Sequence, residues 1–398
     1  MPNTRRMRDQ VWLYDRLIRF GGPDFYWPMT EEVLGAVGMD GSGDIRTVRT
    51  TIRKFADITR EMRRIAEKRE AMAKEAETAG HRVTARQNYF TAACFYTMAQ
   101  GPIHADDEPV NLALSARKNS CYERFIALAA HPVEKVEIPF GDTSLPGYLH
   151  LPPGAKGRVP CVVFLGGMDN FKELLVLQPS DKFLERGIAV LAFDGPGQNE
   201  ARIARKICCT ESNFIDAGRA AMDFLEARPE IDHDRIGITG ISMGSFWLTQ
   251  IVAHDQRYKA AAGFYVCHEP GQETLLNNAI PVFRDRYMWM AGYEDDTAFD
   301  GFAKKLTLEG LGPRIVCPYL IVAGEDDDLS PIEHTHRLYD EIAGPKTLVI
   351  YKGEVHGVSD NLDVRAFIAD WMKDRFDGKP LESSIIYKDC RTGRALKS

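Results

Sequence analysis

The sequence lacks any apolar run long enough to cross a membrane. No window of its 398 residues approaches the roughly 18 consecutive apolar residues that a spanning helix needs. The first residues, MPNTRRMRDQVWLYDRL, are charged and contain neither an apolar core nor a cleavage signature of a secretory signal. We therefore expect a cytoplasmic protein without a membrane partner.

A disulfide framework is also missing. The eight cysteines form no CxxC pair and show no regular spacing, so we expect reduced thiols. Cys208 and Cys209 are adjacent, which would strain a disulfide severely, and no other potential metal ligands cluster beside them. We interpret this pair as packing residues.

Positive charge is not in excess, because 50 Lys and Arg face 57 Asp and Glu for a net charge of −7. No dense basic stripe offsets this balance, so we expect no nucleic-acid partner. The histidine spacings of zinc hydrolases, such as HExxH, are absent as well. The sequence thus favours neither a bound metal nor another cofactor.

What is present is the composition of an ordinary globular protein, with 44% hydrophobic and 27% charged residues. Residues 1–130 contain long stretches of helical spacing and no convincing period-2 alternation, which predicts an all-α domain. The longest helix is expected from about Asp44 to Ala79, with acids and bases paired three and four residues apart. In a second helix, Tyr89, Ala92 and Tyr96 share one face.

After residue 131 the pattern changes to short β-rich runs that alternate with helical segments. VEKVEIPF and LPGYLHLP, separated by turn residues, predict an antiparallel hairpin. The later runs are continuous in Val, Ile and Leu: VPCVVFLGG, IAVLAFDGPG, RIGITG, AAAGFYVC, PYLIVAG and TLVIYKG. This alternation predicts an α/β domain over 131–380 with a mostly parallel, doubly wound sheet. Residues 381–398 are expected to form a short C-terminal extension.

The sharpest local motif is Gly240-Ile241-Ser242-Met243-Gly244, which follows the strand RIGITG and precedes a helical pattern. A GxSxG sequence between a strand and a helix is typical of a nucleophile elbow, a strained turn that exposes the serine hydroxyl. The two glycines keep the neighbouring backbones from colliding. We therefore predict that Ser242 is a nucleophile.

A serine nucleophile needs a base and a carboxylate that orients the base, here in the chain order Ser, Asp, His. His356 follows the strand TLVIYKG and is the only histidine placed after both the acidic turn and a strand end. The turn after PYLIVAG contains Asp326, Asp327 and Asp328. We favour Asp327, which lies three residues after Gly324 and four before Pro331, although either neighbour could also serve.

The oxyanion that develops during attack needs two amide donors. We predict the amide of Met243, directly after the nucleophile, and that of Met168, in the loop after VPCVVFLGG. The segment from Asp194 to Gln198 is expected to shape a loop near the site without chemistry of its own.

With these residues the chain resembles the α/β-hydrolase superfamily over about 131–380. The helix motif that starts at Ala85-Arg86, the loop Gly167-Met168-Asp169-x-x-Lys172-Glu173 and the Asp194–Gln198 segment are similar to a narrower group. That group includes 2,6-dihydroxypseudooxynicotine hydrolase and fungal hydrolases that shorten naphthopyrone polyketides. The resemblance implies a helical cap domain over 1–130, a small-molecule carbonyl substrate and a homodimer. It also implies cleavage of a carbon–carbon bond beside a carbonyl, or of an ester.

One residue of this chain departs from the pattern of the group, and one role known in the group cannot be assigned to a residue here. The residue after GxSxG is often glycine in the group, and here it is Ser245, which we expect to narrow the space beside the elbow. A glutamate assists in the nicotine-pathway relative. Glu269 and Glu273 lie in a comparable region, but no motif selects either as a catalytic residue.

The leading hypothesis is therefore a cofactor-independent serine hydrolase that cleaves a carbon–carbon bond in an aromatic ketone or polyketide-like molecule. The first alternative is a carboxylesterase for small hydrophobic esters, with thioesterase and amidase activity as minor variants. The alternative from another class is a relative that binds a ligand or protein without catalysis. A complete set of Ser242, Asp327 and His356 argues against that class, because binding alone does not need all three residues.

Overall fold

The computed structural model describes residues 6, 10–25, 37–176, 181–358, 363–392 and 394–396. The chain divides into two compact units. The helical unit comprises Met1–Glu134 and Val176–Asp181, and the α/β unit comprises Lys135–Leu175 and Lys182–Ser398. Near residue 131 the sequence changes from helical spacing to short β-rich runs, and this change lies close to the boundary between the two units.

The helical unit contains no strand in its described residues between 10 and 130, as predicted. Its helices are α1 (Val11–Gly21), α3 (Ser42–Thr51), α4 (Asp57–Thr78), α5 (Arg82–Gln100) and α6 (Pro109–Leu128). Short helical turns at Pro23–Phe25 and Gly38–Gly41 precede α3.

The long helix expected from Asp44 to Ala79 is broken, so that prediction was wrong. Ile52 adopts an extended conformation after α3. The Asp57 side chain then accepts the amides of Arg53 and Lys54 at 3.1 and 3.2 Å. This local hydrogen bonding of an aspartate side chain to the main chain competes with the helical hydrogen bonds and turns the chain.

Helix α4 carries the charge pairs that its sequence predicts, but it also has a buried apolar face that the pairing pattern did not indicate. Its buried face contains Ile58, Met62 and Ile65. On the exposed side, ion pairs join residues three or four apart, such as Arg63 with Glu67 at 3.8 Å. The apolar face supplies the packing, and such pairs add a few tenths of a kcal/mol each, on the order of 0.2–0.5.

The α/β unit is built on a nine-stranded sheet with the order β1-β2-β4-β3-β5-β6-β7-β8-β9. The strands are β1 (Val133–Phe140), β2 (Thr143–His150), β3 (Val159–Leu165), β4 (Ala189–Phe193), β5 (Ile231–Ser242), β6 (Ala261–Val266), β7 (Tyr319–Gly324), β8 (Lys346–Lys352) and β9 (Ser384–Asp389). Strand β2 pairs with β4 antiparallel, and every pair from β4 to β9 is parallel. The mostly parallel sheet predicted from the sequence is confirmed.

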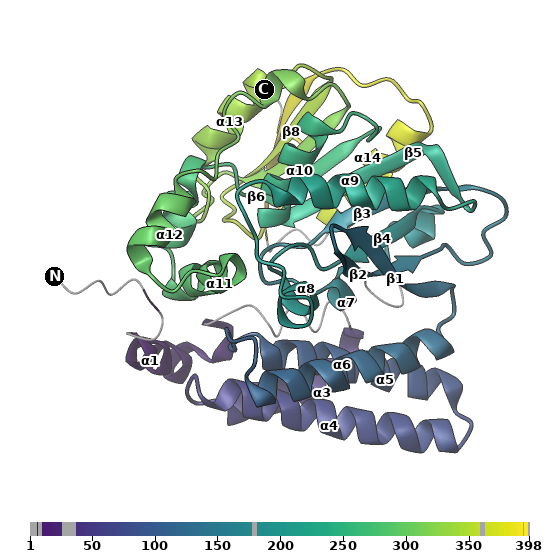
Figure 1. Ribbon diagram of the computed structural model, residues 1–398, viewed down its shortest axis with the longest axis vertical. Helices are drawn as coiled ribbons and strands as arrows, with labels where there is room; N and C mark the ends of the chain where they lie inside the picture. Colours follow the sequence, from purple (N-terminus) through teal and green to yellow (C-terminus); the bar gives the residue numbers. More distant parts are fainter. Residues whose placement is uncertain are drawn as a thin grey trace. The chain divides into compact units, whose positions relative to one another are not determined.

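Helices cover both faces of this sheet, as Figure 1 shows for α9 and α10 in front and α14 behind. The helices of the unit are α7 (Lys172–Leu175), α8 (Asn199–Ile203), α9 (Asn213–Glu226), α10 (Met243–His254), α11 (Pro281–Ala291), α12 (Asp296–Ala303), α13 (Ile332–Glu341) and α14 (Val364–Phe376). Short helical turns lie at Leu184–Arg186, Pro270–Gln272, Thr274–Asn278 and Gly312–Arg314. None of the helices in the described part of the chain combines the length and hydrophobicity needed to span a bilayer.

Two glycines of β5, three residues apart, show why glycine is used between the sheet and the helices on its two faces. A β-carbon on Gly237 would lie 2.7 Å from Met372 Sδ of α14, whereas one on Gly240 would lie 2.7 Å from Leu248 Cδ2 of α10. Successive residues of a strand point to opposite faces, and both faces are occupied by packed helices. The core of the unit accordingly runs along both sides of the central strands.

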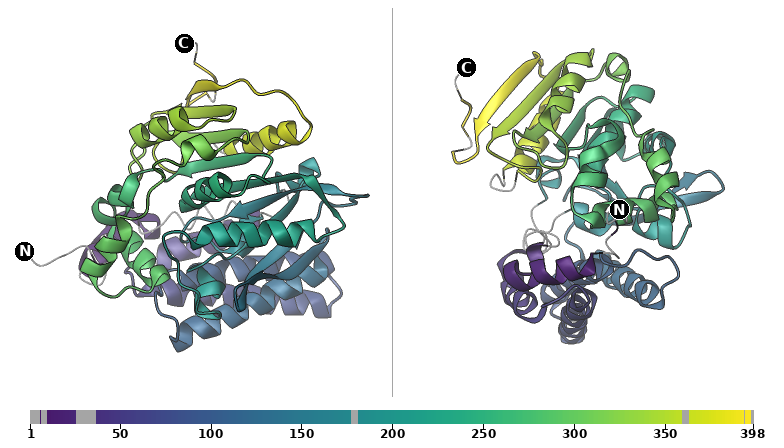
Figure 2. Two further views of the ribbon diagram at one scale, coloured as in Figure 1. Left: turned by 45° about the horizontal axis from the view of Figure 1, so that its top comes forward. Right: turned by 90° about the vertical axis from the view of Figure 1, so that its left-hand side faces the viewer.

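The expected C-terminal extension contains a strand that the sequence analysis missed. Strand β9 pairs in parallel with β8, for example Leu348 with Ile385 and Ile350 with Tyr387. It forms the outer strand of the sheet, yellow in Figure 2. Ile385 and Tyr387 are partly exposed, so the short alternation lacks the continuous apolar signal of the central strands. Residues 393 and 397–398 of the expected extension lie outside the described residues.

The strand order reverses at β3, which lies between β4 and β5. The loop after β3 and the turn after β5 therefore start from neighbouring strand ends, with Leu165 paired to Gly240. In open α/β sheets such a reversal leaves a crevice at the carboxyl ends of the strands. This edge is where the sequence places its candidate catalytic residues.

Candidate active site

Ser242 lies at the junction of β5 and α10 with a left-handed backbone, φ 55° and ψ −126°. A β-carbon on Gly240 would come within 2.3 Å of Gly244 O, and one on Gly244 within 2.5 Å of Leu165 O. Larger residues at either glycine would force the turn apart. The strained backbone of a non-glycine residue is thus held by close packing on both sides.

The structure brings His356 to Ser242 from the loop after β8. His356 Nε2 lies 3.0 Å from Ser242 Oγ. On the other side of the ring, Nδ1 lies 3.0 Å from Asp327 Oδ2 and 3.1 Å from Asp327 Oδ1. The three side chains form a continuous hydrogen-bonded chain in which the imidazole can accept a proton at Nε2 while the carboxylate fixes Nδ1–H.

Among the three aspartates of the acidic turn, Asp327 is the one whose carboxylate faces the imidazole. Its Oδ1 also accepts the amides of Leu329 at 2.9 Å and Ser330 at 2.8 Å. The Asp327 side chain is only 1% exposed. Asp328 instead accepts the main-chain amide of His356 at 3.5 Å. The spacing that favoured Asp327 therefore selects the residue with the required geometry.

Gly324 explains how the acidic turn and the histidine loop come so close. A β-carbon at this position would lie 2.4 Å from Glu354 O and 2.3 Å from Val355 O. The amide of Asp326 also donates to Glu354 O at 2.9 Å. The ends of β7 and β8 are thereby joined directly, which fixes the separation of Asp327 from His356.

The two predicted oxyanion donors flank the same turn. Met243 is the first residue of α10. Met168 follows Gly167, where an added β-carbon would lie 3.1 Å from Ser242 Cβ and 3.2 Å from Ile241 O. The loop after β3 thus passes directly against the elbow, although the role of the Met168 and Met243 amides as donors stays a prediction.

Cys267 is a neighbour of Ser242 that the sequence analysis did not identify. Its Sγ lies 3.6 Å from Ser242 Oγ, and burial raises the pKa of its thiol.

Ser245, the residue after the GxSxG motif, contacts the same segment. The main-chain amide of Cys267 donates a hydrogen bond to Ser245 Oγ at 2.9 Å. Ser245 is fully buried, and this hydrogen bond ties α10 to the residue after β6. The expected narrowing of the space beside the elbow stays a prediction. Only the pairing of β5 with β6 could have revealed either contact.

Neither glutamate considered from the sequence is directed at this group in the contacts of the described residues. Glu269 accepts the amide and hydroxyl of Thr274 at 2.7 and 3.1 Å. Glu273 accepts Asn277 Nδ2 at 2.7 Å. Both carboxylates therefore make local contacts, Glu269 with the first residue of the Thr274–Asn278 turn and Glu273 with a side chain four residues on.

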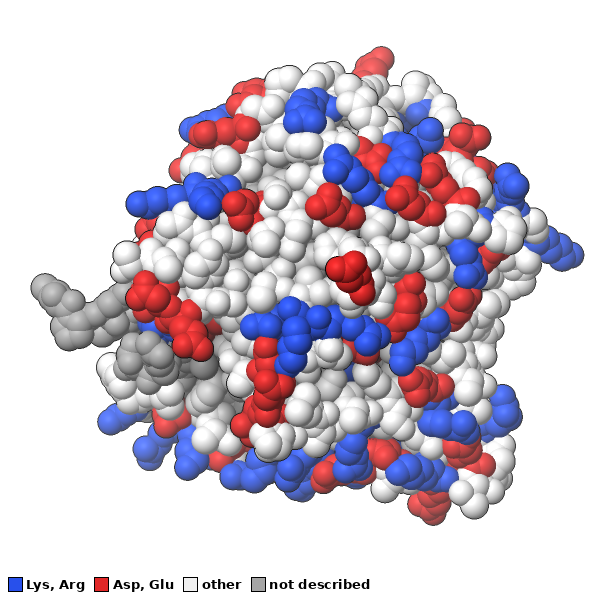
Figure 3. Space-filling view, in the orientation of Figure 1, with Lys and Arg blue, Asp and Glu red and all other residues white. Residues whose placement is uncertain are grey.

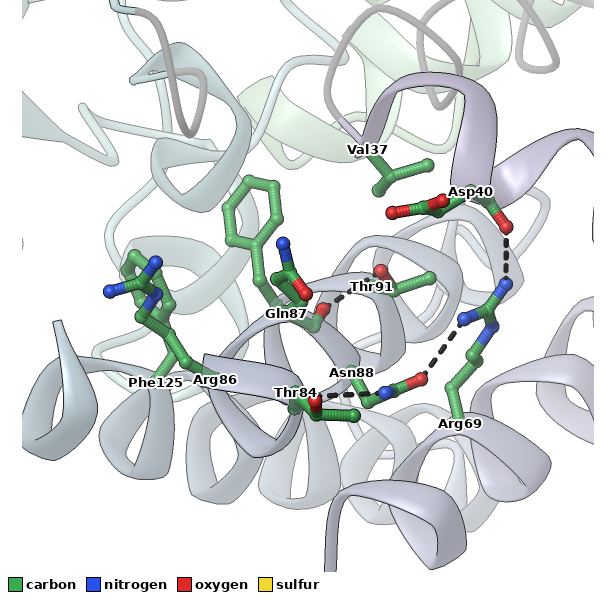
Figure 4. A pocket seen from close by; sticks show the side chains of 10 residues that line it. Val37, Asp40, Arg69, Thr84, Arg86, Gln87, Asn88, Thr91 and Phe125 are labelled. Atoms are coloured by element: carbon green, nitrogen blue, oxygen red, sulfur yellow. Dashed lines mark hydrogen bonds between the residues drawn. The ribbon is translucent and has the colours of Figure 1, made fainter. Parts of the chain in front are cut away.

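The helical unit has a cavity of its own, of about 290 Å³ (Figure 4). Val37, Phe90 and Phe125 contribute apolar side chains to its lining. Among the polar lining residues, Arg69 donates to Asn88 Oδ1 at 3.0 Å and to Asp40 O at 2.7 Å. A volume near 300 Å³ is at the lower end of the range for small-molecule pockets.

Charges are mixed over the surface shown in Figure 3, where acidic and basic side chains are interspersed and no large area carries one sign. Within the described residues, no three His, Cys, Asp or Glu side chains are gathered in a way that could hold a metal ion.

Comparison with known proteins places these observations in a family. The model of the FrsA-like esterase family matches residues 63–377. The α/β hydrolase xenA of Xenoacremonium sinensis is 29% identical over 250 residues, which cover 60% of this chain and 57% of the relative. The 20-hydroxy-prefusarin hydrolase FUS2 of Gibberella moniliformis is 30% identical over 61% of this chain and 59% of its own length. The chain thus spans less than two thirds of these relatives.

A longer match is found with the hydrolase phmG of Phaeosphaeria nodorum, which is 30% identical over 72% of this chain and 76% of the relative. Among solved structures, 2,6-dihydroxy-pseudo-oxynicotine hydrolase superposes with a TM-score of 0.76 at 23% identity. That superposition covers 90% of this chain and 98% of the other. It shows an α/β-hydrolase fold, as the sequence resemblance predicted.

Proposed function

The chain belongs to the family of FrsA-like esterases and is an α/β-hydrolase enzyme, and on this premise we propose that it is a cofactor-independent serine hydrolase. In this proposal Ser242 attacks a carbonyl carbon, His356 transfers protons and Asp327 orients His356. The observation that carries the proposal is the uninterrupted chain of hydrogen bonds from Ser242 Oγ through His356 to Asp327.

The first half of the reaction forms an acyl-enzyme. Ser242 Oγ bonds to the carbonyl carbon while its proton passes to His356 Nε2, and the carbonyl oxygen becomes an oxyanion near the amides of Met243 and Met168. When the oxyanion reforms the carbonyl, the bond to the leaving group breaks. The leaving group takes the proton from His356.

The second half releases the acid. A water molecule gives a proton to His356 and its oxygen attacks the acyl carbon. Collapse of the second oxyanion breaks the bond to Ser242 Oγ, and His356 returns the proton to the serine. The carboxylic acid product leaves and the enzyme is restored.

We propose a carbonyl substrate in which the leaving group is a stabilised carbanion, as in an aryl β-diketone, a hydroxyaryl ketone or a polyketide chain. Such a carbanion has its charge delocalised on a second carbonyl or an aromatic ring before it is protonated. This choice is supported by the names of 20-hydroxy-prefusarin hydrolase and 2,6-dihydroxy-pseudo-oxynicotine hydrolase among the similar proteins. The description of the matched family instead favours an ester. The alcohol that leaves an ester does not need a second carbonyl or an aromatic ring to delocalise its charge.

The test begins with intact-protein mass spectrometry after treatment with a fluorophosphonate. We expect one adduct on the wild-type protein and none on Ser242→Ala, because the probe reacts with an activated serine. Ser144→Ala, which removes a partly buried hydroxyl that donates to Glu137 in the β1–β2 hairpin, serves as the control and should be labelled fully. A panel of aryl esters and aryl β-diketones then identifies the bond that is cleaved.

Absence of the adduct from folded wild-type protein would contradict the proposal and favour the class that binds without catalysis. Homodimer formation, implied by the sequence resemblance, also stays a proposal. Sedimentation equilibrium tests it by asking whether the particle has twice the 44.7 kDa mass of the chain.

A further inference from the structure

The Asp194–Gln198 segment after β4, to which the sequence assigned no chemistry, holds the loop that follows β3. Gln198 is 2% exposed. Its Nε2 donates to Gly167 O at 2.6 Å and to Gly166 O at 3.3 Å. Its Oε1 accepts the amide of Gly195 at 2.8 Å, which fixes the orientation of the side-chain amide. Gln198 thus links the ends of β4 and β3 through three hydrogen bonds.

Further side chains hold the next residues of this loop. Asn170 Oδ1 accepts the amide of Gly167 at 2.8 Å. Arg286 donates to Met168 O at 3.3 Å and to Asn199 Oδ1 at 2.7 Å. Asn199 Nδ2 in turn donates to Asn170 O at 2.7 Å. The carbonyls from Gly166 to Met168 therefore all accept hydrogen bonds from buried side chains.

A buried ion cluster anchors the end of the loop to the same segment. Asp194 accepts the Lys172 amide at 3.1 Å and the Lys172 ammonium at 3.0 Å. The ammonium also contacts Glu200 at 2.7 Å. Burial would lower the pKa of Lys172, but the surrounding carboxylates outweigh it and raise that pKa well above its ordinary value. The loop is fixed at both ends.

The planarity of the peptide bond links Gln198 to the predicted oxyanion donor. Gly167 C=O and Met168 N–H belong to one rigid trans peptide, so they point in opposite directions. The hydrogen bond from Gln198 Nε2 to Gly167 O consequently restricts where Met168 N–H can point. It also polarises the peptide, which strengthens the N–H as a donor.

We infer that Gln198 is a positioning residue that aims the Met168 amide at the oxyanion. The inference rests on the proposed function, because it assumes attack by Ser242 on a carbonyl. Removing a donor from an oxyanion hole costs on the order of 100- to 1000-fold in kcat. Misdirecting one that is still present should cost less, about 10- to 100-fold.

Two variants and a control test this role. Gln198→Met keeps the length of the side chain but removes its hydrogen bonds. We expect kcat to fall about 10- to 100-fold with KM changed less than about threefold. The affinity for an aryl trifluoromethyl ketone, whose adduct with serine carries an oxyanion, should fall by the same factor as kcat/KM. Gln250→Met removes another buried glutamine that donates to a main-chain carbonyl, Glu211 O at 3.0 Å, and should keep both values within about twofold.

Gln198→Glu retains the acceptor for Gly195 and provides a test if the methionine variant does not fold. The carboxylate cannot donate to Gly167 O, whereas the protonated acid can. We expect its kcat relative to wild type to rise as pH falls. A structural contribution alone would alter thermal stability without this pH-dependent recovery.

The outcomes separate the inference from the proposed function. Wild-type protein that takes no phosphonate at Ser242 would overturn both. Wild-type protein that is labelled, together with Gln198 variants that keep wild-type kcat and ketone affinity, would overturn only the inference. An equal loss in Gln250→Met and Gln198→Met would do the same, because it would show a general effect of buried glutamine on the fold.

Discussion

At the residue scale, the carboxylate of Asp327 is constrained more than its neighbours by what surrounds it. It accepts two main-chain amides and the imidazole of His356. These three hydrogen bonds keep the carboxylate from rotating. The imidazole is thereby held with Nε2 directed at Ser242, and it is this orientation that a substitution at Asp327 should disturb.

Asp327→Asn should therefore damage catalysis while preserving the fold. The asparagine oxygen can still accept the amides of Leu329 and Ser330, but its amino group cannot accept Nδ1–H and favours the wrong tautomer of His356. We expect kcat to fall about 10³- to 10⁴-fold, with little change in KM. Steady-state kinetics with the best substrate of the panel would measure this.

The matched control is Asp328→Asn, because Asp328 is exposed and contacts only the His356 amide of this group, at 3.5 Å. Its kcat should stay within a few-fold of wild type. Comparable losses in the two variants would contradict the assignment of the orienting role to Asp327.

The sequence could predict the residues of this group because each lies at the end of a strand or just after it. Ser242 is the last residue of β5, whereas Asp327 and His356 lie in the loops just after β7 and β8, and the carboxyl ends of parallel strands meet at one edge. Cys267 and Gln198 could not be assigned in the same way. Their contacts with Ser242 and Gly167 depend on which strands are neighbours and on side-chain direction, which local spacing does not specify.

At the element scale, the predicted strands have a clear local sequence pattern, whereas the missed strand β9 depends on a long-range contact. The central strands are buried on both faces, so they read as continuous apolar runs. Strand β9 lies at the edge of the sheet, and its SIIYKD sequence places lysine and aspartate beside the apolar residues. Its place in the sheet depends on pairing with β8, a long-range contact. The break between α3 and α4 involves one carboxylate, Asp57, which accepts the amides of Arg53 and Lys54.

Glu70 is the point where three helices of the helical unit are joined. Its carboxylate, on α4, accepts Tyr96 Oη of α5 at 2.7 Å and Arg117 Nη2 of α6 at 2.7 Å, besides Lys74 Nζ at 2.6 Å. Burial acts to raise the pKa of Glu70, but these three donors outweigh it and leave the pKa below its ordinary value of 4.5. The ionised form is the one that joins the helices.

A pKa lowered by folding means that Glu70 stabilises the protein above about pH 4.5 and that this contribution is lost as pH falls through the lower folded-state value. Glu70→Gln should thus reduce the free energy of unfolding by about 1–3 kcal/mol near pH 7. The difference from wild type should shrink near pH 3, measured by urea unfolding at each pH.

Glu67→Gln is the control, since Glu67 is half-exposed and pairs with Arg117 at 3.2 Å. Its effect should stay below about 1 kcal/mol, as for other exposed pairs. A Glu70→Gln effect of equal size at both pH values would show that charge is not the source of the stabilisation.

At the scale of the whole molecule, each unit buries a histidine in its neutral form. Burial lowers the pKa of His268, in the α/β unit, to about 3. In the helical unit, burial and then the charge of Arg86 lower the pKa of His131 to about 4. Both residues regain an ordinary pKa near 6.5 when the chain unfolds. Acid should therefore destabilise both units, although their charges and helix contents differ.

His268 allows this to be tested at one position. Its Nδ1 lies 3.1 Å from Thr335 Oγ1, a contact that the shorter amide of His268→Asn can replace. Because the unfolded state binds the proton more tightly, stability should fall as pH decreases from about 6.5 towards 3. This residue contributes a slope of up to about 1.4 kcal/mol per pH unit. His268→Asn should be less stable than wild type near pH 7 but should lack that slope.

Urea unfolding of wild type and variant between about pH 7 and pH 4 gives the two slopes, and their difference isolates His268 from His131 and the carboxylates. His233→Asn, at a partly exposed histidine of β5, should leave the wild-type slope unchanged. Equal slopes in wild type and His268→Asn would mean that His268 is protonated to the same extent in the folded and unfolded chain. In that case the acid sensitivity of the α/β unit would have to come from its carboxylates, whose protonation removes stabilising contacts only at lower pH.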